Sequence, residues 1–546
     1  MKRRAFINGK IFQGRSLQNP ASEEIVPVYC DTMITEGNRI IFAGTFHEAK
    51  QKNLFNSEIE ITDLSGKLVL PGFIDSHAHI IMGGFYLLGI DLQPAKSKKE
   101  FVEIIKSYLD INKSGWVTGG NWNEQNWEVT ELPGREWVDD FSSDTPIFIS
   151  RMDYHMAFAN SYALRLAGIT KQTPNPEGGE IERDKVTGEP TGILKDKAMN
   201  LVQKVIPART HREMETAALR TLEEARRWGV TSIHDICYDD DFRMLQNLEK
   251  KGELTCRIYA RLPIGKIDSI IETQIEAGFG NDRLKTGSIK GFADGSLGSG
   301  TALFFEPYCD NEGTHGLGME EFNDGRMKEW ILKGDAKRLQ MSIHAIGDKA
   351  NSEIIDYFEE TISLNPKWDR RFRIEHAQHL AEKDFERLGK QEIIVSAQPY
   401  HLYDDGSWAE KKIGKERLKR SFAFQSLLRH GVKLCFGSDF PVVSINPLLG
   451  IYTAVTRHTS DGRNKEGLIP EEKISVVEAV EAYTEGGAYA SFEEEKKGKL
   501  TEGMLADFVI LSENIFEIEK EGIRDVKIVN TVFDGEIIYG EKLVKQ

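Results

Sequence analysis

The sequence of 546 residues predicts an α/β protein built on a (β/α)8 barrel of the TIM type. Three observations lead to this prediction. Eight apolar stretches with β-prone residues alternate with amphipathic helical stretches, which is typical of parallel strands covered by helices. Short strands joined by Gly- and Asn-containing turns occupy both ends of the chain. A segment rich in Trp, Asn, Gly and Pro interrupts the alternation after the first barrel strand. We therefore expect a barrel, a small β-sandwich domain built from both chain ends, and an insertion.

The two ends of the chain have the character of small antiparallel sheets. AFINGKIFQG and DTMITEGNRIIFAG each place a turn between β-prone runs near the N-terminus, and VKIVNTVFDGEIIYGEKLV does so near the C-terminus. We expect residues 1–70 and 498–546 to pair into one composite β-sandwich domain. Two separate β caps are the alternative.

Residues 71–497 are predicted to form the barrel. Its eight strand candidates, the first of which starts just before this range, are KLVLPGFIDSHAH, GVTSIHDI, LTCRIYARLP, TGSIKGFAD, QMSIHAIGD, RFRIEHAQ, EIIVSAQP and VKLCFGSD. Helical stretches such as METAALRTLEEARRWG lie between most of them. An open doubly wound sheet is the rival fold, but its dinucleotide-binding form requires a GxGxxG motif after the first strand, and the sequence has none there.

Residues 80–211 contain no clean βα unit, and we interpret them as an insertion after the first strand. A segment that leaves the carboxyl end of a barrel strand starts at the catalytic rim, so the insertion is expected to cover the active site. Aromatic side chains are candidates for the wall of an apolar pocket, although each is individually more typical of a core. These candidates are Trp122, Trp127, Tyr154 and Trp408.

Composition limits the partners and the compartment. Lys plus Arg total 70 and Asp plus Glu total 86, so the formal charge is −16, which argues against binding nucleic acid or anionic membranes. No apolar run reaches the ~18 residues that span a bilayer. The five cysteines are scattered and form no CxxC pair, which favours a reducing cytoplasm. The expected partner is a small-molecule substrate, and a homodimer is left open as the assembly.

Polar residues follow the apolar runs at four predicted strand ends. His77 and His79 end the first strand and, at i and i+2, share one face of it. His344 ends the fifth strand, His376 the sixth and Asp439 the eighth. A barrel brings its carboxyl strand ends to one place, where catalytic groups lie. Neutral imidazole and carboxylate are ligands that suit zinc or a similar divalent ion.

Lys290 lies on the fourth predicted strand, between the two groups of histidines. A lysine inside a barrel is costly to bury as a cation. It can lose its charge by reacting with carbon dioxide to form a carbamate, whose two oxygens can bridge two metals. A pair with a nearby acid such as Asp294 is the alternative. Lys195, which lies in the insertion, is the less favoured candidate for the same role.

Five motifs in order carry a resemblance to a known family. They are PGFIDSHAH, KGFADGSLGS, SIHAIGDKA, IEHAQ and FGSDFPV. In combination they resemble the metal-dependent amidohydrolase superfamily and, within it, the amidohydrolase 3 group of YtcJ-like proteins. The resemblance implies a site for one or two divalent ions, with zinc as the expected metal and a carbamate on the strand-four lysine. Its ligands would be His77, His79, Lys290, His344, His376 and Asp439. One departure is Gly300, which stands where many relatives carry an arginine.

The resemblance also implies an activity. We expect a metal-dependent hydrolase that cleaves a non-peptide C–N bond in an amide, an N-substituted formamide or a cyclic amide. Asp439 would be the catalytic base that takes the proton of the attacking water. In the insertion, RMDYHMAFAN resembles the family pattern and implies that His155 and Arg151 face the substrate. With Trp122 and Tyr400, which follows the seventh strand, these are the substrate-binding candidates.

Two other functions stay open at this point. The same site would attack a lactone or another ester equally well. A catalytically inactive binding or regulatory protein on the same barrel is the alternative of another class, although all six ligand positions are filled. His234, at the end of the second strand, is either structural or close to the site.

Overall fold

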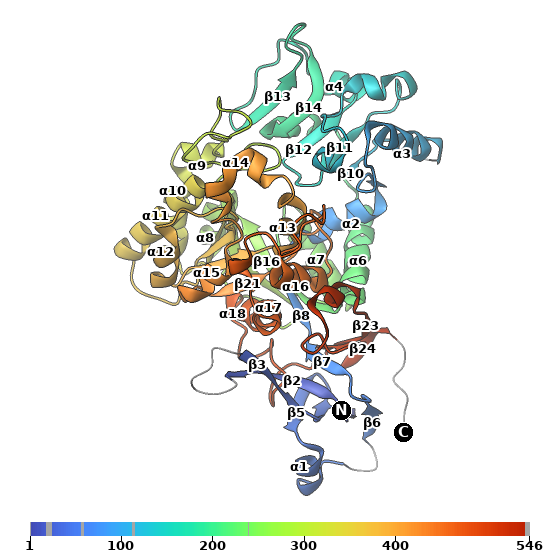
Figure 1. Ribbon diagram of the computed structural model, residues 1–546, viewed down its shortest axis with the longest axis vertical. Helices are drawn as coiled ribbons and strands as arrows, with labels where there is room; N and C mark the ends of the chain where they lie inside the picture. Colours follow the sequence, from blue (N-terminus) through green and yellow to red (C-terminus); the bar gives the residue numbers. More distant parts are fainter. Residues whose placement is uncertain (1, 18–24, 56–58, 112–114, 239, 541–546) are drawn as a thin grey trace.

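The computed structural model describes residues 2–17, 25–55, 59–111, 115–238 and 240–540. Three parts follow one another along its longest axis (Figure 1). Strands from both chain ends lie at one end, a barrel lies in the middle, and the segment between the first two barrel strands lies at the opposite end.

The central sheet is an eight-stranded parallel barrel in the predicted order. Neighbours pair in sequence from β8 to β21, and a parallel bridge between Ala78 and Phe440 joins the first strand to the segment after the last. All eight predicted strands are therefore confirmed. They are β8 (Phe73–Ala78), β15 (Val230–Asp235), β16 (Arg257–Pro263), β17 (Leu284–Phe292), β18 (Met341–Ala345), β19 (Arg373–His376), β20 (Ile394–Ala397) and β21 (Leu434–Phe436).

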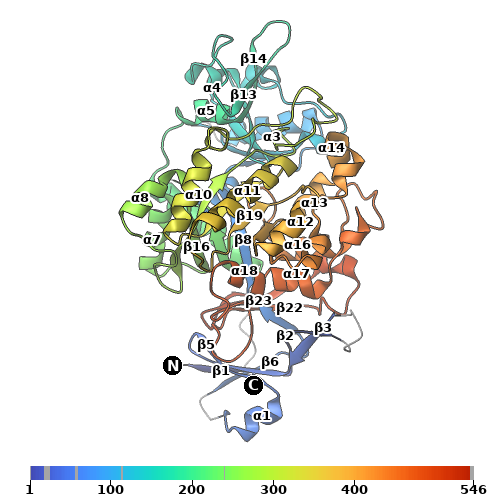
Figure 2. The ribbon, with the colours of Figure 1, turned by 90° about the vertical axis from the view of Figure 1, so that its left-hand side faces the viewer.

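Helices surround the barrel and bury their apolar stripes against it (Figure 2). α6 shows how the local sequence sets a boundary: Thr210 and Glu213 form a capping box at its start. The helices that follow strands include α2 (Ile80–Leu88), α6 (His211–Arg227), α7 (Asp241–Lys251), α8 (Ile267–Glu272), α10 (Arg326–Ala336), α11 (Asp348–Leu364), α12 (Asp384–Lys390), α13 (Pro399–Asp405), α15 (Phe424–Arg429), α16 (Pro447–Thr456), α17 (Val476–Ala482) and α18 (Glu485–Ala490).

Strands from the two chain ends share one six-stranded sheet, ordered β24-β23-β22-β7-β2-β3, and a four-stranded sheet, β5-β4-β1-β6, packs beside it. One hydrophobic cluster joins the sheets, with Phe6 set edge-on against Phe508 at 4.9 Å. The strands are β1 (Arg3–Ile7), β2 (Lys10–Leu17), β3 (Ile25–Cys30), β4 (Thr32–Glu36), β5 (Arg39–Gly44), β6 (Glu60–Asp63), β7 (Leu68–Pro71), β22 (Phe508–Leu511), β23 (Ile528–Phe533) and β24 (Glu536–Gly540).

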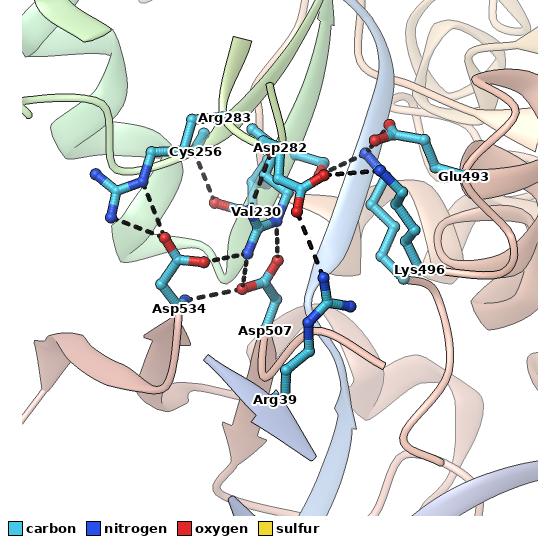
Figure 3. Close-up of polar contacts among 12 residues, drawn as sticks. Arg39, Val230, Cys256, Asp282, Arg283, Glu493, Lys496, Asp507 and Asp534 are labelled. Carbon is cyan, nitrogen blue, oxygen red and sulfur yellow. Dashed lines mark hydrogen bonds and ion pairs between the residues drawn. The ribbon is translucent and has the colours of Figure 1, made fainter. Parts of the chain in front are cut away.

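Buried charges hold these terminal strands to the amino end of the barrel (Figure 3). Arg257, the first residue of β16, donates to Asp507 at 2.9 Å and also contacts Asp534. The Arg257 and Asp507 side chains are only 2% and 5% exposed. Arg39 and Asp282 form a second, more exposed ion pair at 3.4 Å. The junction is therefore an ion-pair network with a buried centre.

The segment between β8 and β15 forms its own mixed sheet, ordered β13-β14-β12-β11-β10-β9. The sequence predicted an insertion here without βα units, but it did not predict this sheet. Its strands are short, and β10 begins with two glycines; a Cβ on Gly120 would lie 2.4 Å from the Ser150 carbonyl oxygen. The elements are β9 (Ile90–Asp91), α3 (Lys98–Ile111), β10 (Gly119–Trp122), β11 (Phe148–Arg151), β12 (Met156–Ala159), α4 (Ser161–Leu166), β13 (Gly179–Arg183) and β14 (Pro190–Asp196).

Among the described residues, no helix combines the length and the apolar character needed to cross a membrane.

Candidate metal centre

Two histidines and one carboxylate meet where β8 and β21 end. The His79 Nε2 atom lies 3.1 Å from Asp439 Oδ1, and the His77 Nε2 atom lies 3.3 Å from the same oxygen. All three residues are buried, and their ligand atoms lie within 4.8 Å of one another. The HxH pair shares one face, as the strand periodicity predicts, and the chain after β21 brings Asp439 to it.

A second group of three uses the other side of the same carboxylate. His376, at the end of β19, and His401, in α13, join Asp439 in a cluster with ligand atoms within 4.8 Å. The His376 ring lies 4.7 Å from the His77 ring and 4.4 Å from the His344 ring. The four histidines predicted from strand ends therefore do come together. His344 is in neither group of three, and its Nε2 lies 3.2 Å from the Gly295 carbonyl oxygen.

Several site residues have left-handed backbone conformations. The φ angles are 74° at His376, 61° at Asp439, 57° at Tyr154 and 46° at Asp196. For residues other than glycine this conformation is strained, and such strain is concentrated at functional sites. The chain is thus held in unfavourable turns at the places where it presents these side chains.

Protonation suits the two groups to a cation. Burial lowers the pKa of His79 to about 4 and holds that of His376 well below its usual value, so both imidazoles are neutral at neutral pH. Burial alone would raise the pKa of Asp439, but His77 and His79 hold it well below its usual range. Neutral imidazole and an ionised carboxylate are the donors that zinc prefers.

Lys290 lies on β17 and is 2% exposed. Its Nζ atom has no hydrogen-bond partner within the described part of the chain and lies 4.0 Å from the centre of the Phe292 ring. The alternative pairing with Asp294 is not made, since that carboxylate accepts backbone N–H groups of Leu303, Ile346 and Gly347. Burial lowers the pKa of Lys290 to about 7, so a large fraction is an uncharged amine at neutral pH.

A buried charge cluster, unforeseen from the sequence, lies behind His77. Glu375 Oε2 is 2.6 Å from His77 Nδ1, while Arg261 and Arg373 form ion pairs with the other carboxylate oxygen at 2.8 and 3.0 Å. Burial would raise the pKa of Glu375, but the two guanidinium groups hold it well below its usual range. A carboxylate on the second ring nitrogen fixes the tautomer and orientation of a ligating histidine. The only sign of this cluster in the sequence is that charged residues, Arg and Glu, interrupt otherwise apolar barrel strands.

His234 lies in this buried layer and not at the cavity. It is fully buried on β15, and its Nδ1 accepts a hydrogen bond from Arg373 Nη1 at 3.0 Å. The sequence left open whether His234 is structural or lies close to the site, and its buried position agrees with the structural alternative.

A cavity of about 400 Å³ opens beside the site. Lys290 lines it from the barrel, and His155 and Tyr154 line it from the insertion. Much of the remaining wall is apolar, including Met199, Ile264, Phe292, Met319, Met327 and Trp330. Apolar walls with a few polar groups are typical of small-molecule sites.

His155 is an ion-paired group at this cavity. Its Nδ1 lies 2.6 Å from Asp196 Oδ1, and its ring centre lies 5.4 Å from that of His344. Burial opposes the charged form, but Asp196 and Asp153 raise the pKa of His155 to about 9. His155 is therefore a cation at neutral pH. Asp196, which was not predicted, sits at the end of a strand of the insertion.

The other predicted substrate residues have different surroundings. Arg151 is buried, with its guanidinium bonded to Glu124 and Asp153 at 2.8 Å each, so its donors are engaged within the protein. Trp122 is 0% exposed in the core of the insertion and presents no surface to a ligand. Tyr400 stacks on Tyr403, with ring centres 5.1 Å apart.

The remaining aromatic candidates separate in the same way. Tyr154 lines the cavity, whereas Trp127 and Trp408 are buried in two separate hydrophobic clusters. Lys195 forms ion pairs with Glu180 and Glu182 in the insertion. Its amine is therefore engaged there, unlike that of Lys290.

Residues 60–539 match the amidohydrolase family. The chain belongs to this family. The amidohydrolase is 38% identical to protein LONG AFTER FAR-RED 3 of Arabidopsis thaliana, over 97% of this chain and 91% of that protein. It is 32% identical to the putative amidohydrolase YtcJ of Bacillus subtilis, over 93% and 97%. It is 26% identical to the N-substituted formamide deformylase of Arthrobacter pascens, over 93% and 94%.

Solved structures agree with this assignment of the amidohydrolase. A metal-dependent hydrolase from Pyrococcus horikoshii, described as uncharacterized, superimposes with a TM-score of 0.76 at 28% identity. The similarity covers 95% of this chain and 99% of that one. The family resemblance carried by the five sequence motifs is therefore confirmed.

Proposed function

We propose that this amidohydrolase is a metal-dependent hydrolase that cleaves a non-peptide C–N bond, in an amide, an N-substituted formamide or a cyclic amide. The observation that carries the proposal is the meeting of His77, His79, His376 and Asp439 with an unpaired Lys290 beside a cavity. The names of two relatives support it, since one is a putative amidohydrolase and another an N-substituted formamide deformylase.

The residues fit one or two divalent ions, with zinc as the proposed metal. Neutral imidazoles and one carboxylate form two overlapping groups, each large enough for an ion. Buried atoms without a hydrogen-bond partner in the described chain include Lys290 Nζ, His376 Nδ1 and His401 Nε2. Buried polar atoms are normally satisfied, so unpaired atoms at such a site favour a bound ion. When bound, the ion would lower the pKa of a water molecule toward neutral and polarise the substrate carbonyl.

The chain's own side chains would carry the protons and the substrate. The Asp439 carboxylate stays ionised, so it can accept the proton of the attacking water and return it to the leaving nitrogen. An amide and water thus give a carboxylic acid and an amine. Because His155 Nδ1 bonds to Asp196, its Nε2–H is the donor that can orient a substrate oxygen. The apolar wall would hold a substituent of the substrate.

We also propose that Lys290 is carboxylated. The uncharged amine adds to carbon dioxide and releases one proton, which gives a carbamate. The lowered pKa of Lys290 makes the uncharged amine available for this reaction. Because Lys290 lies beside the histidines, the two carbamate oxygens could bind the metal. Replacing Lys290 with Ala should remove at least one ion from the loaded protein. Electron density at a metal-loaded Lys290 without an extra carboxylate would refute this part of the proposal.

A substrate panel tests the reaction class. The purified protein, loaded with zinc, is incubated with simple amides, N-substituted formamides, cyclic amides and lactones, and products are followed by mass spectrometry. We expect release of amine from at least one nitrogen substrate, abolished in His77→Ala plus His79→Ala. Turnover of lactones alone would favour the esterase alternative. Full metal loading with no turnover of any class would favour a binding or regulatory protein.

We propose a cytoplasmic location, which the five free cysteines support. A small-molecule partner and a homodimer are likewise retained as proposals.

A further inference from the structure

We propose that the substrate carries apolar groups on both sides of its C–N bond, and that a second cavity, lined by α2, holds one of the two groups. This inference rests on the proposed function and narrows it to amides with two apolar substituents. The second cavity, called the α2 cavity below, has a volume of about 500 Å³. It is distinct from the cavity of about 400 Å³ beside Lys290, called the Lys290 cavity.

The two cavities meet beside the candidate metal centre. Tyr154, Gln203 and Tyr238 line both of them. The Tyr238 ring stacks on the His79 ring, with ring centres 5.8 Å apart and an angle of 7° between the planes. Although it contacts this buried histidine, Tyr238 is 40% exposed. Because this shared wall contacts a candidate metal ligand, a substrate bond at the centre can extend one group into each cavity.

The sequence of α2 turns an apolar face toward the α2 cavity. The helix begins directly after the HxH pair, and a Cβ on Gly84 would lie 1.8 Å from a backbone oxygen of α6. The face that packs against α6 therefore requires glycine. Met82, Phe85 and Tyr86, at i, i+3 and i+4, share the opposite face and line the α2 cavity. All three are only half-buried, so apolar surface is left for a ligand.

The rest of the wall also favours an apolar group. The charged side chains at the α2 cavity have partners within the protein. Arg209 donates to Thr118 at 2.9 Å, and Asp241 accepts a backbone N–H at 2.9 Å. Asp240 faces an arginine of α7 at 4.0 Å. Further apolar side chains come from the insertion and from the segment that leads into α6, namely Phe148, Ile206 and Met214.

Two apolar cavities at one centre separate classes of amide. A formamide carries only hydrogen on its carbonyl carbon, so it would fill one cavity at most. An amide with an apolar group on each side would remove both apolar walls from water, which favours its binding. The expected substrate is therefore an N-substituted amide of an aryl or alkyl carboxylic acid.

Three amides test the proposal on the zinc-loaded protein. N-phenethylformamide has its apolar group on nitrogen, N-methylphenylacetamide has it on the carbonyl side, and N-phenethylphenylacetamide has one on each side. Amides differ in intrinsic reactivity, so the value of kcat/KM for each amide is compared between wild type and variants. Thermal unfolding confirms that each variant is folded.

Ala208→Trp is the variant that narrows the α2 cavity. Ala208 lies in an exposed loop and lines this cavity alone. Val205→Trp is the matched control, since Val205 is 39% exposed in the same loop and lines neither cavity. We expect Ala208→Trp to lower kcat/KM for the two-sided amide at least about 10-fold, the usual minimum for one lost methylene in an apolar pocket. One of the one-sided amides should keep its value, and it identifies the group that the Lys290 cavity holds.

Met82→Trp narrows the same cavity from α2 and is measured beside Ala208→Trp. A two-sided amide that is hydrolysed equally well by wild type and by both folded variants overturns the proposal. So does an equal loss in Val205→Trp. In either case the hydrolysis itself leaves the proposed function standing.

Hydrolysis of none of the three amides would instead contradict the proposed function. Binding of the two-sided amide, measured by calorimetry on the same zinc-loaded proteins, then tests the α2 cavity without turnover. We expect Ala208→Trp to raise Kd at least about 10-fold and Val205→Trp to leave it unchanged. Equal values of Kd in all the proteins, or no binding to wild type, would overturn the role of the α2 cavity.

Discussion

At the scale of the residue, the centre depends on Asp439, which faces ligands on two sides. Its Oδ1 lies near His77 and His79, and its Oδ2 lies near His401. The left-handed φ of 61° and the backbone hydrogen bond from Asp439 N to the His77 carbonyl at 2.6 Å fix this position. The strained turn after β21 therefore holds one carboxylate where its two oxygens face different histidines.

Replacing Asp439 with Asn should keep the fold and remove turnover. The amide has nearly the same shape, but it cannot accept a proton at neutral pH. We expect kcat to fall by about 10²–10⁴-fold, the usual contribution of general acid–base help. The assay is hydrolysis at matched metal content. Near-normal turnover in a fully loaded Asp439→Asn would assign the proton transfer to another group.

His155 gives the site a dependence on pH. Its pKa of about 9 lies above the ordinary histidine value, so the ion pair with Asp196 is complete below about pH 6.5 and is lost as pH rises through about 9. We expect KM to rise above pH 9 with little change in kcat, because a bond made equally to substrate and transition state affects binding alone.

His155→Ala should show the raised KM at every pH, with metal content unchanged. Asp196→Asn, which keeps the hydrogen-bonding shape but removes the charge, should shift the rise in KM to lower pH. A loss of metal in His155→Ala would instead make His155 a ligand or a support for one. Unchanged constants in both variants would place the substrate elsewhere.

At the scale of the element, the sequence predicted the strands whose hydrophobic patterns are local and clear. The barrel strands are apolar runs, four of which are followed by the polar residues of the candidate site, and all eight lie where these runs are. GGEIERD and TGEPTGILKD are typical of a turn-rich hairpin and do form the antiparallel pair β13 and β14. The strands β9 and β10 were not foreseen, because GGNW and the two-residue β9 have no alternating pattern. Glu375 was not assigned a role, because its partner His77 lies on another strand, 298 residues away in the sequence.

The junction between β16 and the terminal strands makes a prediction about stability. Asp507→Ala should lower the free energy of unfolding by about 3–5 kcal/mol, the usual effect of removing one partner of a buried ion pair. Asp534 stays beside Arg257 in this variant, but it is shared with Arg283. The half-exposed pair of Arg39 and Asp282 is the control, and Arg39→Ala should cost about 0–1 kcal/mol. Denaturant unfolding of both variants measures this. Equal losses would mean that burial does not set the strength of the junction.

At the scale of the whole molecule, the candidate metal ligands come from the barrel, whereas the cavity wall combines residues of the barrel and of the insertion. Tyr154, His155 and Asp196 line the cavity from the insertion, which lies at the top of Figure 1. The terminal strands lie at the opposite end and contribute no residue to the cavity of about 400 Å³. We therefore expect changes in the insertion to alter substrate choice and changes at barrel strand ends to alter metal content.

The metal content of His77→Ala plus His79→Ala, measured beside wild type after identical purification, tests the central claim most directly. We expect one to two divalent ions per chain in wild type, loss of at least one in the folded double variant, and loss of hydrolysis with it. His47, an exposed histidine outside both groups, supplies a control as His47→Ala. A folded double variant with the metal content and hydrolysis of wild type would contradict the account.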